Sequence, residues 1–269
     1  MTAVSDTGKP VPERGGRRRR PSIAALIAGG VLVAAAFLLT EPLPWPEALF
    51  TVLLLAVLPA VVLAAEGPPQ LPPGATRHGI YTTTWVGLWT LAGLAAAAVV
   101  RAPNVSARLG LVMPAPRLVL GWSIALTVAG AAIVALWRAF GHGEAEIGRF
   151  LIPRTGAERL HYAWLSVTAG VTEEIVFRGF LVGAIDAAAG SMWLAVAVSS
   201  AVFGLAHRYQ GTSGAARAGV LGAILCAPLV VLDSVVPAIV AHAALDLLAG
   251  LWWRERLWRE TIVPPRSSL

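Results

Sequence analysis

Residues 162–185 read YAWLSVTAGVTEEIVFRGFLVGAI. The stretch is longer than the roughly 20 residues that a helix needs to cross a bilayer. It nevertheless contains Glu173, Glu174 and Arg178. Charged side chains are costly in lipid, and within membrane helices they usually face the interior of the bundle and mark a functional site. The stretch therefore predicts a transmembrane helix that carries chemistry.

The rest of the chain has the composition of a membrane protein. Hydrophobic residues make up 57% and charged residues 13% of its 269 residues, and the mean hydropathy is +0.70. A soluble domain could not bury this much apolar surface. We expect an all-α, polytopic transmembrane helix bundle of about eight spans, with the sixth and seventh short. Its apolar runs are 22–40, 47–65, 81–100, 118–140, 162–185, 192–206, 218–232 and 235–253.

The distribution of positive charge predicts the orientation of these spans. The net charge is +6, and if the basic tail at residues 1–21 is cytoplasmic, eight crossings leave most of the Lys and Arg residues on that side. The positive-inside rule then places both termini in the cytoplasm of a multi-pass cell-membrane protein. We therefore assign the basic residues to topology and expect no nucleic-acid partner.

The chain divides at changes of composition. The loop 141–160 is rich in charge and separates a first half without candidate site residues from a second half that holds all of them. The expected units are a disordered tail (1–21), N-terminal transmembrane helices (22–140), a cytoplasmic connector (141–160), a membrane domain with the site (161–253) and a second tail (254–269).

Two further motifs follow the Glu-Glu pair. Residues 203–207 read FGLAH and residues 242–246 read HAALD. On a helix Glu174 and Arg178 share one face, so the arginine can hold that carboxylate while Glu173 stays free to react. Asp246 lies one turn after His242 and could orient its ring or join it in binding. Carboxylates with two histidines can bind zinc or activate a water molecule directly.

The order EExxxR, FxxxH and HxxxD on successive apolar segments resembles the CAAX protease and bacteriocin-processing family of intramembrane endopeptidases, which includes the type II CAAX prenyl proteases and lysostaphin-resistance-like proteins. The resemblance covers about residues 160–250. It implies a membrane protease with a cavity open to the cytoplasm, acting on a membrane-associated or lipidated peptide. Many relatives have Asn where this chain has Asp246, and a carboxylate donates a hydrogen bond only when protonated.

The resemblance also implies roles for the candidate residues. Glu173 with His207 would activate water, and His242 with Asp246 would stabilise the oxyanion or bind a metal. Glu174, Arg178 and Phe203 would support them. Zinc bound by Glu173, His207 and His242 is left open.

Two other functions fit intramembrane acids and histidines. A proton- or ion-coupled transporter should carry such residues in both halves of the chain, and here they concentrate in the second. An inactive membrane scaffold would tolerate losing a motif residue, and every motif is intact. Both arguments favour an enzyme.

Two expectations concern local structure. His207 ends an apolar run of about 15 residues, too short to cross the membrane. We therefore expect that run to stop within the bilayer, followed by non-helical backbone over 208–219 that dips inward to line a wet cavity. The segment 101–117, with three arginines among apolar residues, suits a strip in the headgroup region.

Overall fold

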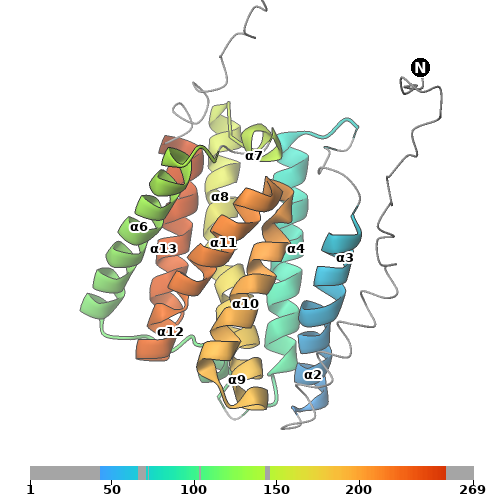
Figure 1. The fold of residues 1–269 in the computed structure, drawn as a ribbon, viewed down its shortest axis with the longest axis vertical. Coiled ribbons are helices and arrows are strands. Elements are labelled where there is room, and N and C mark those ends of the chain that lie inside the picture. Colours follow the sequence, from blue (N-terminus) through green and yellow to red (C-terminus); the bar gives the residue numbers. More distant parts are fainter. Residues whose placement is uncertain (1–42, 66–70, 72, 103, 143–145, 253–269) are drawn as a thin grey trace, which may run out of the picture.

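The computed structural model describes residues 43–65, 71, 73–102, 104–142 and 146–252. These residues form an all-helical bundle (Figure 1). The expected first span at 22–40 and the two tails lie outside the described residues. The helices are α2 (Trp45–Val52), η1 (Leu53–Val57), α3 (Leu58–Ala64), α4 (Arg77–Ala98), α5 (Val105–Arg108), α6 (Pro116–Ala139), α7 (Glu146–Phe150), α8 (Gly156–Glu173), η2 (Glu174–Val182), α9 (Gly183–Ala189), α10 (Met192–Ala206), η3 (His207–Gln210), α11 (Gly211–Leu225), α12 (Ala227–Leu232), α13 (Val236–Leu247) and η4 (Leu248–Trp252).

The all-helical fold is confirmed, and three segments of the described residues are long and apolar enough to cross a membrane. They are Trp45–Ala64, Pro116–Ala139 and Met192–Leu232. The count of about eight spans and the cytoplasmic termini stay predictions. Helix α4 begins at Arg77, and Thr76 caps it by accepting a hydrogen bond from the amide of Gly79.

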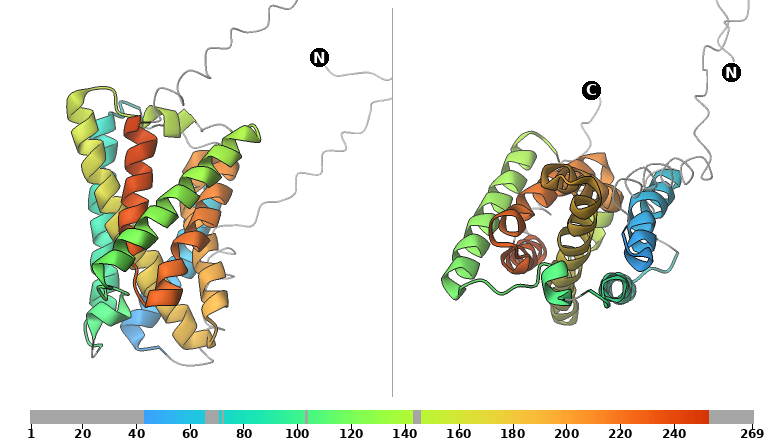
Figure 2. Two further views of the ribbon diagram at one scale, coloured as in Figure 1. Left: turned by 90° about the vertical axis from the view of Figure 1, so that its left-hand side faces the viewer. Right: turned by 90° about the horizontal axis from the view of Figure 1, so that it is seen from below.

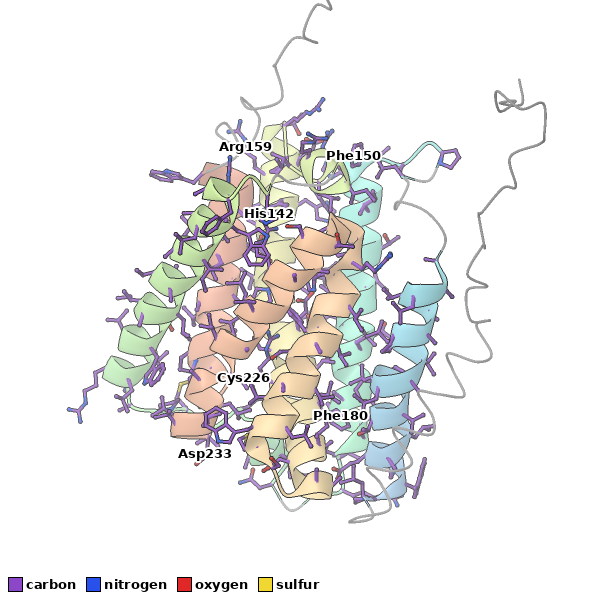
Figure 3. All side chains as sticks on the ribbon, viewed as in Figure 1. His142, Phe150, Arg159, Phe180, Cys226 and Asp233 are labelled. Carbon is purple, nitrogen blue, oxygen red and sulfur yellow. The ribbon has the colours of Figure 1, made fainter. Side chains whose placement is uncertain are left out.

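The continuous rod of α8, η2 and α9 forms the centre of the bundle. Its buried residues Phe180, Leu181 and Val182 pack in one apolar core with Leu54 of η1. The rings of Phe50 and Phe180 meet edge to face at 4.9 Å. Figure 3 marks Phe180 and Cys226, both buried, in the lower half of this core.

Small residues let the helices that carry the site come close together. A side chain at Gly170 of α8 would lie 2.8 Å from the carbonyl oxygen of Ile239 in α13. A side chain at Gly204 of α10 would lie 2.7 Å from the carbonyl oxygen of Ala215 in α11. Close backbone approach of this kind is typical of packed membrane helices. It holds α13 against α8 and α11 against α10, while α6 crosses obliquely over α13 (Figure 2).

The expectation of non-helical backbone over 208–219 is wrong. The chain reverses at the short 3₁₀ turn η3, with Gly211 at a positive φ of 81°, and continues as α11. Figure 1 shows α10 and α11 as the two arms of this helical hairpin. Glycine and serine in this stretch indicated a loop, but close packing on α10 favours a helix here instead.

The central part of the segment 101–117 packs against the protein, and its expected place in the headgroup region stays a prediction. Leu109 is buried, and the amide of Val235 donates a hydrogen bond of 2.8 Å to the carbonyl of Gly110. Arg108 forms an ion pair with the buried Glu47 of α2 at 2.5 Å. The segment packs into the protein because its apolar residues and one arginine find partners there.

Candidate active site

Glu173 and Glu174 lie where the central rod changes its winding. Helix α8 starts with a capping box between Thr155 and Glu158, and its regular α-helical part ends at Glu173. The next nine residues form the π-helix η2. Short π-helical segments occur frequently at functional sites because they redirect side chains that an α-helix would place elsewhere. Here the change separates the two neighbouring carboxylates.

Glu174 and Arg178 form the ion pair expected from their spacing. Nη1 of Arg178 lies 3.2 Å from Oε1 of Glu174, and the side chains are 1% and 0% exposed. The guanidinium stacks on Phe203 at 4.0 Å, and its Nε donates to the carbonyl of Gly222 at 3.4 Å. Because Gly222 has no side chain, the arginine can reach this position. Arg178 therefore links η2 to both arms of the α10–α11 hairpin.

Glu174 also binds His242. Nδ1 of His242 lies 2.7 Å from Oε1 of Glu174. A carboxylate oxygen can accept the Nδ1–H proton, and such a contact fixes both the tautomer and the orientation of an imidazole. The ring is therefore held with Nε2 directed away from Glu174. Nε2 lies 3.8 Å from Oε2 of Glu173 and 3.8 Å from Oδ2 of Asp246.

His207 is fixed in the same way by the backbone. It begins η3, directly after the last residue of α10, and its Nδ1 donates to the carbonyl of Phe203 at 2.9 Å. Because a carbonyl oxygen only accepts, Nδ1 carries the proton and Nε2 keeps its lone pair. Nε2 lies 3.8 Å from Oε2 of Glu173. His207 and His242 thus present the same ring atom to one carboxylate oxygen.

The three motifs therefore meet at one point. Oε2 of Glu173 is buried and makes no hydrogen bond to any other described residue. Its separation of 3.8 Å from both imidazole nitrogens is too long for a direct hydrogen bond, and a water molecule can bridge such a distance. The arrangement suits a group that receives a proton from bound water.

Asp246 lies at the outer edge of the site. Its side chain is 39% exposed, whereas those of His207 and His242 are largely covered. The backbone carbonyl of Asp246 accepts a hydrogen bond from the hydroxyl of Tyr162 at 3.2 Å. Sequence spacing suggested Asp246 as the group that orients His242, but Glu174 occupies that position at Nδ1. Asp246 faces Nε2 instead.

Sequence reasoning missed two contributors. Gly222 accepts from Arg178 and leaves space for it, and Ser199 of α10 donates to the carbonyl of Phe177 at 2.6 Å. Neither stands out by residue type. The one sequence feature that could have pointed to Gly222 is its position in the apolar segment that follows the FxxxH motif.

A zinc ion fits the donor types but not the spacing. In a tetrahedral zinc site with bonds of about 2.0–2.1 Å, the donor atoms lie roughly 3.4 Å apart. Here Oε2 of Glu173 is 3.8 Å from each Nε2. Within the part of the chain that the structure describes, no group of three or more His, Cys, Asp or Glu side chains is arranged to hold a metal ion. We therefore derive no catalytic step through a metal.

Comparison with known families agrees with the motifs. Residues 155–248 match the family model described as type II CAAX prenyl endopeptidase Rce1-like. The resemblance to the CAAX proteases is confirmed over this segment. The Rce1-like segment contains all three motifs, from Glu173 to Asp246, and begins at the cap of α8. Together with the apolar helices it supports a membrane protease. No curated protein and no solved structure matched the chain.

Proposed function

We propose that the protein is an intramembrane endopeptidase in which Glu173 activates the attacking water. One observation carries the proposal. Nε2 of His207 and Nε2 of His242 both lie 3.8 Å from the buried Oε2 of Glu173. A water molecule among these atoms can donate one hydrogen bond to Glu173 and the other to His207, which leaves an oxygen lone pair free to attack.

In the first step the water oxygen attacks the carbonyl carbon of the scissile peptide bond. The water proton passes to Oε2 of Glu173, and the carbonyl oxygen becomes the oxyanion of a tetrahedral intermediate. His242, in its imidazolium form, donates from Nε2 to this oxyanion while Glu174 holds Nδ1. In the second step the C–N bond breaks, and Glu173 returns its proton to the leaving amine. The products are a free carboxyl group and a free amine.

The other site residues act through this centre. Arg178 and Phe203 hold Glu174, and Glu174 holds His242. Asp246 lies at the exposed edge of the site. Its carboxylate is near Nε2 of His242, where a negative charge favours the imidazolium form of that ring. The substrate is proposed to be a membrane-associated or lipidated peptide that enters from the cytoplasmic side of the cell membrane. The basic residues predict that orientation.

The test is a cleavage assay with purified full-length protein in detergent and a lipidated C-terminal peptide. Glu173→Gln removes the base but keeps the size of the side chain, so we expect cleavage to be lost. Asp186→Asn is the matched control, because it removes a carboxylate from α9 of the same rod, outside the site. Substantial cleavage by the Glu173→Gln protein would rule out the glutamate-base mechanism.

A zinc-assisted form of the same reaction is the second proposal, with Glu173, His207 and His242 as ligands. The donor types match zinc but their spacing does not, so this form requires the three side chains to move closer together. Bound zinc would then supply Lewis-acid activation of the water. Metal analysis of the purified enzyme, with chelator treatment and zinc add-back, separates the two forms. Activity that survives complete removal of zinc excludes the second.

A further inference from the structure

A second cluster of polar rings lies outside the candidate active site, between the N-terminal turns of α4 and α8. Nδ1 of His78 lies 3.0 Å from Nδ1 of His161. The two ring centroids are 5.3 Å apart and the ring planes are inclined by 31°. In Figure 3 the label of Phe150, which contacts the neighbouring Arg77, marks this end of the bundle.

The two imidazoles are held by a fixed scaffold. Nε of Arg77 donates to the carbonyl of Phe150 at 2.6 Å and to that of Ile152 at 3.1 Å. The hydroxyl of Tyr81 donates to the carbonyl of Leu151, and its ring meets His161 edge-on at 5.5 Å. These contacts fasten the first turn of α4 to the segment that leads into α8. The pair is therefore organised before any ligand arrives.

We propose that His78 and His161 form a binding site for a divalent transition-metal ion, which goes beyond the proposed peptidase function. Neutral imidazole is the commonest protein ligand for such ions. A metal ion in place of the shared proton would be bound by both Nδ1 lone pairs. Because His78 is exposed and His161 is partly exposed, water can complete the coordination sphere.

The chemistry of the two nitrogen donors favours copper over zinc. Square-planar nitrogen sites are typical of Cu²⁺, which also binds most tightly in the general order of divalent metals. The site should therefore bind Cu²⁺ more tightly than Zn²⁺.

Binding at this site would tie two helices together. His78 lies on α4 and His161 on α8, the helix whose far end carries Glu173. A ligand that binds only the folded protein raises its thermal stability. The bound ion should therefore raise the melting temperature of the whole bundle.

The experiment uses full-length protein without a polyhistidine tag, in detergent, titrated with Cu²⁺ or Zn²⁺ alone. We expect one equivalent of Cu²⁺ with two nitrogen ligands in the electron paramagnetic resonance spectrum, together with a rise in melting temperature. His78→Ala and His161→Ala should each abolish that equivalent and the rise. His142→Ala is the control, because the centroid of the His142 ring lies 5.4 Å from that of Trp137 and the ring takes no part in the His78–His161 pair.

His78→Gln serves where alanine at that position fails to fold, since it keeps a hydrogen-bonding side chain. Metal held by Glu173, His207 and His242 would persist in the His78 and His161 variants, so it is counted separately. Unchanged copper stoichiometry and an unchanged spectrum in folded His78 and His161 variants would overturn the proposal. That result would leave the peptidase mechanism untouched.

Discussion

Nδ1 of His242 lies 2.7 Å from Oε1 of Glu174, although 68 residues separate them in the sequence. The same oxygen atom is 3.2 Å from Nη1 of Arg178. Glu174 thus joins the one buried arginine of the EExxxR motif to a histidine of the last motif. Arg178 can therefore influence the position of the His242 ring through Glu174.

We predict that Glu173→Ala, His207→Ala and His242→Ala each reduce the rate of peptide cleavage by at least about 100-fold, the lower range for general acid–base catalysis. Because Glu173 and His207 act on the same water molecule, the double variant Glu173→Ala/His207→Ala should be little slower than either single variant. The measurement is kcat/KM in the purified assay. Multiplicative losses in the double variant would show that the two residues act independently.

Arg178→Ala should damage the fold as well as the activity. It removes the guanidinium that pairs with the fully buried Glu174, and breaking a buried ion pair typically costs about 3–5 kcal/mol. Thermal unfolding in detergent measures the loss. The control is Arg208→Ala, which removes an arginine from the partly exposed turn η3. A wild-type melting temperature for Arg178→Ala would disprove the pairing.

Gly222→Ala should lower kcat by up to about 100-fold with little change in KM, since small displacements of catalytic groups have effects of this size. The added carbon would lie 3.0 Å from Nη2 of Arg178 and 3.2 Å from the ring of Phe203, so the arginine must shift. Gly121→Ala is the control, because its added carbon meets no atom within 4 Å. An equal loss in both variants would point to a general effect of alanine.

The pH dependence of stability should include a contribution from the cap of α8. Hydrogen bonds from the backbone amides of Arg154 and Thr155 lower the pKa of Glu158. A lowered pKa in the folded state adds stability above the pKa of the unfolded state, and this stability is lost as the pH falls through the folded value. Glu158→Gln should therefore be less stable than wild type at neutral pH, and the difference should shrink in acid. An unchanged difference from pH 7 to pH 3 would contradict this account.

The connector 141–160 should lie in the cytoplasm, as the positive-inside rule predicts. In a Cys226→Ser background, a cysteine at position 150 should react with a membrane-impermeant thiol reagent only after the cells are opened. A cysteine at position 113, whose methionine is 71% exposed at the other end of α6, should react in intact cells. The reverse labelling pattern would invert the topology.

Much of the fold follows from the sequence, because apolar length and period decide where membrane helices form. The meeting of the three motifs could also be predicted, since intramembrane charges must find one another or water. The partner of His242 could not. Spacing along α13 favoured Asp246, and only the packing of Gly170 on α13 brings Glu174 to the ring instead.

Two local features were beyond sequence reasoning for different reasons. No pattern of residue types predicts the π-helix that begins at Glu174. Tertiary contacts of the buried side chains around Phe177 stabilise this less favourable winding, and such contacts cannot be read from the sequence. The helix that begins at Gly211 has a composition that favours a loop. Close packing of Gly204 and Gly219, whose backbones lie together, stabilises it.

The reversal of the chain at His207–Gly211 affects how many membrane spans a hydropathy plot assigns to this region. Residues 192–232 form one uninterrupted apolar helical segment of 41 residues by length and composition. In space the segment runs out along α10 and back along α11. If each arm is one crossing, as the apolar runs 192–206 and 218–232 predict, a hydropathy plot that scores the segment as a single crossing changes the parity of the count and assigns the chain after α12 to the opposite side of the membrane. His207 marks the point at which one apparent span would then be counted as two.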